Sequence, residues 1–337
     1  TWKAAPTNGQ YNNAANWVGG NIPASSSVGT LYTATFGTSL TTTIAVAAPS
    51  PPELYVGSFQ FNAGASAYTF NVADGTNLRF HGAGIVNNSS NAPTFNLDGS
   101  SSNLWLGSAA KAGNAIINIT NGGDLLLGDT ASAENAVINV TGSNSAGIEM
   151  FGGTLGDATV TLSGDGSTGL VLRQTASGGS ARVIANGGSI NIVNLTGAGT
   201  TLGSLAGAST SFNVNLGSKQ LTVGGNNDST SFAGRLNGSG GSIGKAGTGT
   251  WTLTNGTHTY DGLTTISGGT LALSGNGNLA NSSGIALTNS GTTFDISAAN
   301  GNRTIKDLSG VAGSAVVLGT RTLSVGTAND TIFAGEI

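Results

Sequence analysis

One short apolar phrase returns along this chain at nearly constant spacing, and it restricts the possible folds more than any other feature. Each copy flanks a small polar residue with two apolar ones, as in Phe70-Asn-Val72 and Ile117-Asn-Ile119. Regular repeats of roughly 20–25 residues, built from short strands and polar turns, are typical of solenoids. Successive copies lie 25, 22, 21 and 22 residues apart, and they begin at Phe70, Phe95, Ile117, Ile138 and Val160.

A second apolar phrase follows each first one after a turn rich in Gly, Ser and Asn. Both phrases alternate apolar and polar residues with a period of two, so each presents one apolar face as a strand. No segment shows the helical period of 3.6, which disfavours leucine-rich and helical repeats. The sequence predicts an all-β fold, a right-handed single-stranded parallel β-helix whose equivalent strands stack about 4.8 Å apart. The second phrases begin at Leu78, Leu104, Leu125, Ile148 and Leu170.

Composition agrees with an elongated β-protein and excludes several other classes. Charged residues make up only 8% of the chain and 56 residues are Gly, yet hydrophobic residues reach 38%. Disordered chains lack large aliphatic residues, whereas here they recur throughout. A net charge of −4 without any basic cluster argues against a nucleic-acid partner. No stretch approaches the ~20 apolar residues that span a bilayer, and the absence of Cys excludes disulfides.

The organisation predicted from these patterns has two parts. Residues 1–66 are expected to form an N-terminal cap and the first rungs, and residues 67–337 the regular rungs of the helix. The first strands of a solenoid have no preceding partner, so its terminal repeats need atypical capping residues. Trp2, Tyr11 and Trp17 are the residues expected to close that end.

A longer repeat dominates after Arg182. Leu216–Gly224 reads LGSKQLTVG and matches Leu318–Gly326, LGTRTLSVG, at an offset of 102 residues. A Phe-Ala-Gly phrase follows each copy, at Phe232 and at Phe333. The last residue, Ile337, falls inside the second copy, so the chain is expected to be a fragment that ends in mid-repeat.

Residues 241–271 carry the most specific pattern, GSIGKAGTGTWTLTNGTHTYDGLTTISGGTL. This segment resembles the passenger-associated transport repeat of bacterial autotransporters. The matching positions include Lys245, Gly247, Tyr260, Gly262 and the closing Gly269-Thr-Leu271. The departures are Trp251 where Leu is usual, His258 where Asn is usual, and Asp261 where Thr is usual; none disturbs the alternation.

The resemblance implies several properties that the repeat pattern alone does not. It implies an exported passenger, displayed on the bacterial surface or secreted, with an outer-membrane translocator barrel beyond residue 337. During export the partners would be that barrel and the outer-membrane assembly machinery. The family assigns the repeat a role in export, for which rungs that fold as they emerge would oppose backsliding. The opening segment Asn16–Pro23 is similar to the beginnings of other autotransporter-like passengers.

Alternation turns one stripe of the second strands away from the core. Arg79, Trp105 and Glu149 lie on this stripe and are the candidate ligand-binding residues, with Leu126 and Val171 beside them. An outward Trp next to Arg can stack on a sugar or on an aromatic group of a partner. The alternative is that an arm or loop covers the stripe, because exposed aliphatic residues favour cover.

A second outward stripe belongs to the first strands and consists mainly of amides. Side chains of one type at the same position of successive rungs can form a hydrogen-bonded ladder. The stripe is therefore either such a structural ladder or a polar contact face. Its members are Asn71, Asn96, Asn118, Asn139 and Thr161.

Residues suited to catalysis are few and scattered. His258 is expected to make a hydrogen bond in a turn, and His81 is expected in a turn at the end of a strand. Glycosidases need two carboxyl groups roughly 5–10 Å apart, and adjacent rungs would bring Asp124 near Glu149. Most acids, including Asp74 and Asp98, stand beside Gly or Asn in turns. The sequence predicts no catalytic residue, no metal ligand and no cofactor.

Three functions remain open at this stage. The leading hypothesis is a surface adhesin or self-association module, whose partner is a host-surface or glycan ligand or a second copy of itself. The second is a β-helical enzyme that hydrolyses or cleaves polysaccharides. The third is an inert stalk that carries a functional tip elsewhere.

Overall fold

The computed structural model describes residues 1–47, 53–142, 147–164, 169–327 and 329–337. Contacts divide the chain into two units. Unit 1 comprises Thr1–Val171 and Thr175–Ser177, and unit 2 comprises Leu172–Gln174 and Gly178–Ile337. Both units are all-β parallel solenoids, which confirms the predicted fold class. The predicted division between residues 66 and 67 stays a prediction.

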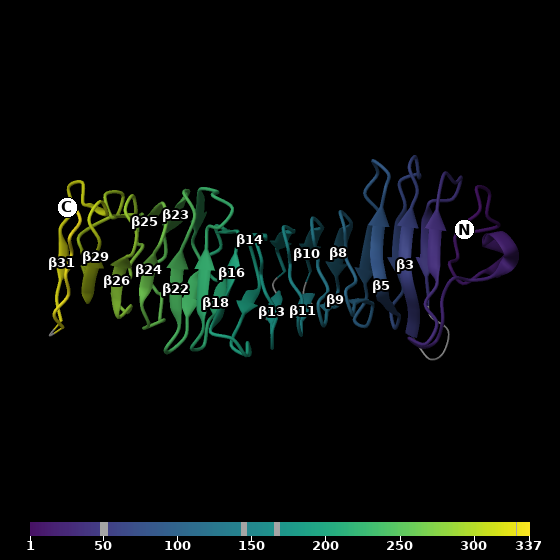
Figure 1. The fold of residues 1–337 in the computed structure, drawn as a ribbon, viewed down its shortest axis with the longest axis horizontal. Helices are drawn as coiled ribbons and strands as arrows, with labels where there is room; N and C mark the ends of the chain where they lie inside the picture. The colour runs from purple at the N-terminus through teal and green to yellow at the C-terminus, as the bar shows by residue number, and fades with distance from the viewer. Residues whose placement is uncertain (48–52, 143–146, 165–168, 328) are drawn as a thin grey trace. The chain divides into compact units, whose positions relative to one another are not determined.

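The first sheet of unit 1 contains the second apolar phrase of each repeat. Its strands pair in parallel in the order of the chain, one strand from each turn of the solenoid, and several of them are labelled in Figure 1. We call each such turn a rung. The strands are β1 (Thr33–Phe36), β3 (Glu53–Phe61), β5 (Asn77–Asn87), β7 (Asn103–Leu106), β9 (Asp124–Leu127), β11 (Gly147–Met150) and β13 (Leu170–Leu172).

The second sheet of unit 1 contains the first apolar phrase, in the register that the repeat spacing predicts. Phe70 pairs with Phe95, Phe95 with Ile117, and Ile117 with Ile138. Ile138 then pairs with Val160, so all five repeat positions form one stack. The strands are β2 (Thr43–Val46), β4 (Thr69–Val72), β6 (Thr94–Asp98), β8 (Ile116–Thr120), β10 (Val137–Val140) and β12 (Thr159–Leu162).

A third side closes each rung of unit 1 through single bridges instead of full strands. Gly84 bridges Lys111, which bridges Ser132, and the series continues through Thr154 to Ser177. Gly84 has a φ of 78°, and a Cβ there would lie 2.3 Å from the Lys111 carbonyl oxygen. Only glycine fits at this close approach of two backbones.

Unit 2 has the same plan with shorter strands. The strands within its described residues pair in parallel, as in β16–β19 and β23–β25. Its strands are β14 (Arg182–Ala185), β15 (Ser189–Asn191), β16 (Gly199–Leu202), β17 (Ser204–Ala206), β18 (Asn213–Asn215), β19 (Gln220–Val223), β20 (Thr230–Phe232), β21 (Arg235–Asn237), β22 (Ser242–Lys245), β23 (Thr250–Leu253), β24 (Thr264–Ile266), β25 (Thr270–Leu273), β26 (Gly284–Leu287), β27 (Thr293–Asp295), β28 (Arg303–Ile305), β29 (Asp307–Gly310), β30 (Ala315–Val317) and β31 (Leu323–Val325).

The repeat of 102 residues corresponds to a repeated strand–turn–strand. Leu216 lies between β18 and β19, and Leu318 lies between β30 and β31. Leu221 of β19 is buried in the first copy, whereas its equivalent Leu323 is only half-buried. The two copies therefore share their local fold but not their burial.

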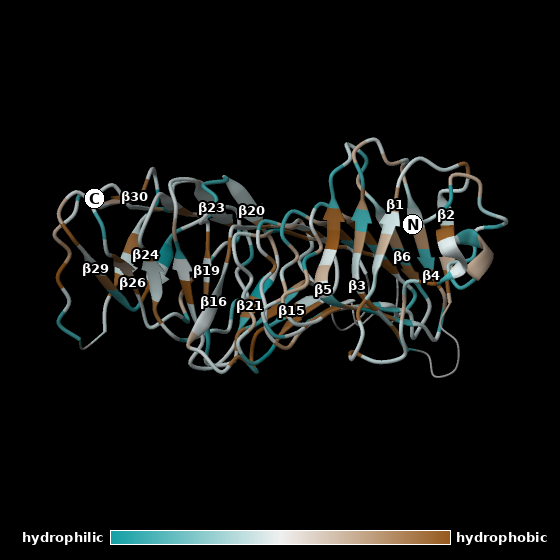
Figure 2. Ribbon diagram, turned by 45° about the vertical axis from the view of Figure 1, so that its right-hand side comes forward, coloured by the Kyte–Doolittle hydropathy of each residue, from teal (hydrophilic) through white to brown (hydrophobic). Residues whose placement is uncertain are grey.

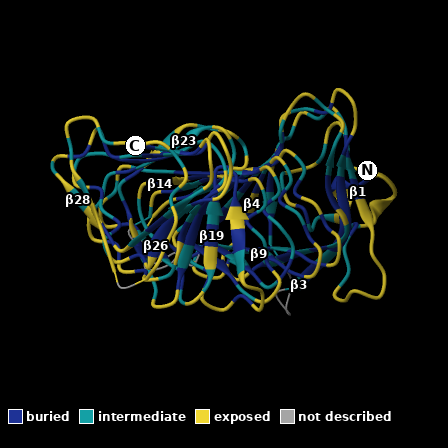
Figure 3. Ribbon diagram, turned by 60° about the vertical axis from the view of Figure 1, so that its left-hand side comes forward, coloured by how far each residue is buried: buried dark blue, intermediate teal, exposed yellow. Residues whose placement is uncertain are grey.

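Alternation places the core inside each coil. On most strands, buried residues alternate with partly exposed ones, and the apolar residues concentrate on the strands (Figure 2). Exposed residues gather in the connecting turns (Figure 3). The first rungs of unit 1 contain stacked aromatic residues, with the Phe70 and Phe95 rings 4.9 Å apart. Later rungs continue this core with aliphatic residues such as Ile117, Ile138 and Val160.

The N-terminal aromatic residues are buried against the first rungs. Trp2, Tyr11 and Trp17 are each no more than 2% exposed. The Tyr11 ring stacks on Phe59 at 5.5 Å, and Trp17 contacts Phe36 edge to face at 5.9 Å. Two short 3-10 helices, η1 (Ala14–Asn16) and η2 (Val18–Gly20), lie in this segment. Its role as a cap stays a prediction.

Among the described residues, the structure contains no helix with the length and hydropathy needed to cross a membrane.

Candidate functional site

The outward stripe of the first sheet forms a row of stacked side chains. Strand register places Tyr55 beside Arg79, and Arg79 beside Trp105. The Arg79 guanidinium lies 4.8 Å from the centre of the Trp105 ring and 5.8 Å from that of Tyr55. Phe151, which directly follows β11, stacks on Trp105 with ring centres 6.1 Å apart and planes 13° apart. We call Tyr55, Arg79, Trp105 and Phe151 the aromatic row.

This packing limits what Trp105 can offer to a ligand. Arg79 lies one rung before Trp105 and Phe151 lies two rungs after it, so they occupy opposite faces of the indole. A ligand therefore meets the edge of the Trp105 ring and not the open face that sugar stacking uses. Arg79 is further held by an ion pair with Glu53.

The five residues of the stripe differ in exposure. Arg79, Trp105, Leu126 and Glu149 are half-buried, and Val171 is buried. Because four of its five residues are half-buried, the stripe is neither fully exposed to solvent nor fully covered by another segment. Two buried glycines after the strands leave space for the indole: a Cβ on Gly107 would lie 2.9 Å from Trp105 Nε1, and one on Gly128 3.4 Å from Cζ2. Ligand binding by Arg79, Trp105 and Glu149 stays a prediction.

The structure places Asp124 and Glu149 on neighbouring strands of this stripe. Burial, and then the Glu149 charge, raise the pKa of Asp124 to about 6. A glycosidase pair with one protonated and one ionised carboxyl would have this electrostatic arrangement. However, Asp124 Oδ1 is buried, whereas a general acid must reach the glycosidic oxygen. The arrangement favours a structural role for Asp124.

His81 does not lie where the sequence predicts. It was expected in a turn at a strand end, but β5 continues through it to Asn87, so that prediction is wrong. The Phe80-His-Gly82 sequence marks an irregularity in the pairing of β3 with β5, which a strand can absorb without ending. The Tyr55 and His81 rings lie 5.6 Å apart. Burial and then the Arg79 charge lower the pKa of His81, whereas Asp129 raises it.

The second outward stripe is a hydrogen-bonded ladder of amides, one of the two alternatives considered above. Asn96 Nδ2 donates to Asn71 Oδ1 at 2.8 Å. Asn118 donates to Asn96 at 2.9 Å, and Asn139 donates to Asn118 at 3.0 Å. Each amide has a second N–H and a second lone pair that the ladder does not use. An open hollow of about 530 Å³ lies beside it, lined among others by Asn71, Asn96, Asn118 and Asp98.

The outward surface of β4, β6, β8 and β10 is nearly uncharged. We call it the amide face and define it by Asn71, Asn96, Asn118 and Asn139 with the outward residues that border them. The first outward row of these strands consists of Thr69, Thr94, Ile116 and Val137. Asp98 is the one charged residue in the four strands.

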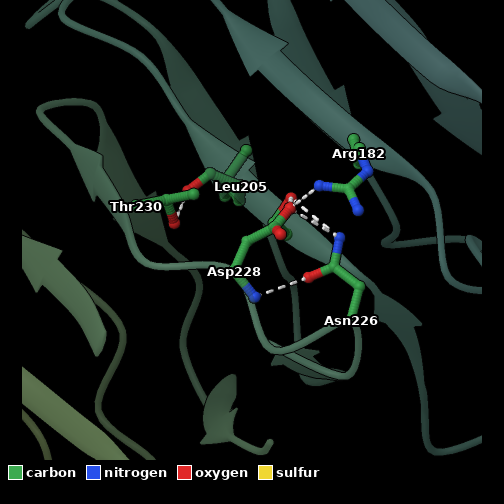
Figure 4. A network of polar contacts seen from close by, with 6 residues as sticks. Arg182, Leu205, Asn226, Asp228 and Thr230 are labelled. Carbon is green, nitrogen blue, oxygen red and sulfur yellow. Dashed lines mark hydrogen bonds and ion pairs between the residues drawn. The ribbon is translucent and has the colours of Figure 1, made fainter. Parts of the chain in front are cut away.

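A further network in unit 2 was not predicted. The Asp228 carboxylate accepts from Arg182, from Asn226 Nδ2 at 3.0 Å and from Ser204 Oγ at 3.3 Å (Figure 4). Thr230 Oγ1 donates to the Leu205 carbonyl at 2.9 Å beside it. Asn227, which precedes Asp228, has a positive φ of 65°. Residues up to 46 positions apart share the carboxylate, which local sequence does not reveal.

Lys245 of the transport-repeat segment has an unusual position in the core. Register places it between Val223 and Ile266. Its ammonium donates to the carbonyls of Ala246, Gly247 and Gly268 at 2.6, 3.0 and 3.0 Å. Burial lowers the pKa of Lys245 to about 8, so the charged form still predominates at pH 7. Lys245 thus binds together the backbones of two rungs.

Replacing Lys245 with methionine is expected to destabilise these rungs by about 1–3 kcal/mol, because the carbonyls lose their donor while the apolar stem is kept. Hydrogen exchange of peptides covering residues 242–270 measures the loss. Lys219→Met is the control, since Lys219 donates to one carbonyl, Gly197, at 3.0 Å. Equal loss of protection in the two variants would contradict the assigned role.

The remaining repeat residues that depart from the family pattern are also structural. Trp251 is 1% exposed, and its Nε1 donates to the Leu205 carbonyl at 3.2 Å. His258 is 3% exposed and its Nδ1 accepts the Leu236 backbone N–H at 3.2 Å, so the expected hydrogen bond is present. Asp261 accepts from Ser239 at 3.1 Å and from the backbone N–H of Gly240 at 2.5 Å. Each of these contacts joins one rung to another.

Comparison with known proteins identifies the same segment. Residues 244–273 match the passenger-associated-transport-repeat family. Comparison with curated proteins and with solved structures gives no match. Among the described residues, no group of three or more His, Asp and Glu side chains is placed to hold a metal ion.

The parallel β-solenoid and the matched repeat together fit an autotransporter passenger. The repeat implies a protein that is exported and then displayed at the surface or secreted.

Proposed function

We propose that this passenger acts in adhesion or self-association, without catalysis, and that the amide face is its contact surface. The observation that supports this is the combination of low charge and regular spacing on that face. Its amides are aligned by their own ladder and keep donors and acceptors directed outward. A partner therefore finds an ordered array of polar groups whose orientation costs little entropy on binding.

The chemistry of the face suggests an uncharged polar partner. Val137 is 39% exposed, and together with Ile116 it adds apolar contact area between the polar rows. A second copy of the same face or a neutral glycan would fit this surface. A strongly charged partner would not, because Asp98 is the one charged residue in these four strands. The aromatic row is less suited, because its rings already contact one another.

Lysines at Thr94 and Val137 test the proposal without removing the ladder amides. Bacteria that display the chain through a translocator barrel are expected to lose aggregation or surface adhesion at least tenfold with Thr94→Lys/Val137→Lys. The reason is that two unpaired charges on each copy must be desolvated in the contact. Settling and adhesion assays measure it. Ala109→Lys, at an exposed position outside this sheet, is the control.

A charge-reversal pair separates the two kinds of partner. If copies bind one another, cells with Thr94→Lys/Val137→Lys are expected to aggregate with cells carrying Thr94→Glu/Val137→Glu, although neither variant aggregates alone. If the partner is a glycan, mixing restores nothing and purified wild-type chain binds glycan-coated surfaces. Unchanged aggregation and adhesion in the lysine variant would overturn the proposal.

A further inference from the structure

A second polar ladder in unit 1 lies at the start of the strands that carry the aromatic row. Register aligns Glu53 with Asn77, Asn77 with Asn103, and Asn103 with Asp124. Asn77 Nδ2 donates to Glu53 Oε1 at 3.1 Å, and Asn103 Nδ2 donates to Asn77 Oδ1 at 2.6 Å. We call these four residues the carboxyl–amide row.

The direction of this row is fixed at its Glu53 end. Glu53 forms an ion pair with Arg79 and is therefore a carboxylate that can only accept hydrogen bonds. Asn77 must direct its amide N–H toward Glu53, which leaves its Oδ1 facing the next rung. Asn103 must then donate in its turn. The carbonyl oxygen of Asn103 is thus directed at Asp124.

The row ends in two acceptors that have no donor. Among the described residues, neither Asn103 Oδ1 nor Asp124 Oδ1 has a hydrogen-bond partner, and both atoms are buried. The Gly147 backbone N–H already serves the Asp124 carboxyl group. Two buried acceptors on register-paired residues repel each other unless one carries a proton. An amide oxygen does not carry one at ordinary pH, whereas a carboxyl group does.

We propose that Asp124 takes up a proton in the folded chain on mild acidification and then donates a hydrogen bond to Asn103 Oδ1, which makes the β7–β9 junction a pH-dependent contact. The proton completes a continuous row of donors from Asp124 to Glu53. When it is lost, the buried carboxylate faces the Asn103 oxygen and the junction weakens. Acidification is therefore expected to stabilise the pairing of β7 with β9, and alkalinisation to destabilise it.

The surrounding charges agree with this direction. Glu149, on β11, adds a second negative charge next to Asp124 and so favours its protonated form. The four residues of β7 include no titratable side chain. Arg79 on β5 is paired with Glu53 on β3. His81 lies within β5, four positions beyond Asn77, and Asp129 lies two residues after the end of β9. Burial raises the pKa of Asp124 to about 6, compared with 3.8 in an open chain.

Carboxyl NMR and hydrogen exchange on the whole chain test the proposal. The Asp124 signal, assigned by its loss in Asp124→Asn, is expected to titrate near pH 6. Opening of β7 and β9, corrected for intrinsic exchange, is expected to be about tenfold less frequent at pH 5 than at pH 7.5, as linkage requires for that difference in pKa. Asp98→Asn is the control, because Asp98 already accepts from Thr120 and Asn121.

Two substitutions separate a shared proton from simple burial of a charge. Asn at position 124 can donate to Asn103 at every pH, so Asp124→Asn is expected to keep these strands protected at both pH values. Asp124→Ala removes the donor and is expected to leave them less protected than wild type at pH 5. Titration of Asp124 below pH 5, or equal protection in the two variants at pH 5, would overturn the proposal.

Discussion

Replacing Trp251 with alanine is expected to destabilise the rungs around β23 by about 3–5 kcal/mol, the usual cost of truncating a buried tryptophan. Trp251 is 1% exposed and its ring lies 6.4 Å from that of Phe232 on the neighbouring strand β20. Its Nε1 reaches the Leu205 carbonyl, so one side chain connects β23 with β17. Alanine would leave both a cavity and a carbonyl without this donor.

Because each rung of a solenoid contacts only its neighbours, the damage is expected to stay local. Hydrogen exchange should rise in peptides covering residues 230–273 and residues 204–206 of β17, whose carbonyl loses its donor, and remain unchanged in peptides of unit 1. Trp251→Leu, which restores the usual residue of the repeat, is the matched control and should lose less protection than Trp251→Ala. A uniform rise over the whole chain, or no rise near β23, would contradict this account.

The repeats explain why the sequence predicted the fold so closely. A spacing near 22 residues specifies which strands are neighbours, and the alternation of Phe70, Asn71 and Val72 specifies which side is the core. Register then follows because a shift by one residue would turn Phe70 outward. Pairing of Phe70 with Phe95 and of Ile117 with Ile138 confirms this reasoning. The amide ladder follows from the same alignment.

Contacts that depend on side-chain length and direction were not predictable in this way. The Lys245 stem follows the core before its ammonium turns to three carbonyls, a path that the repeat pattern does not reveal. Asp74 illustrates a second limit. It was expected to serve its own turn, but it accepts the Ser101 backbone N–H of the next rung at 3.0 Å. Turn residues in a solenoid have neighbours along the stack that local sequence does not show.

Acidification is expected to destabilise the transport-repeat rungs through His258. Burial lowers the pKa of His258 to about 4, from 6.5 in an open chain. Its Nδ1 accepts the Leu236 N–H, and Nε2 has no partner among the described residues, so the imidazole is held in its neutral form. Between pH 6.5 and 4 the unfolded chain binds a proton that the folded chain does not. The folded state therefore loses stability as pH falls through this window, by about 3 kcal/mol at its lower end.

Comparison with His258→Asn isolates this effect from the titration of the carboxyl groups, which both chains share. Asparagine is the usual residue at this position of the repeat and does not titrate, so the variant should lose less protection than wild type between pH 7 and pH 4. Hydrogen exchange of peptides covering residues 232–266, corrected for intrinsic rates, measures the difference. His81→Asn, in unit 1, should leave these peptides unchanged. Parallel pH profiles for wild type and His258→Asn would show that His258 is protonated as readily in the folded chain as in the unfolded chain. That result would contradict the lowered pKa on which this prediction depends.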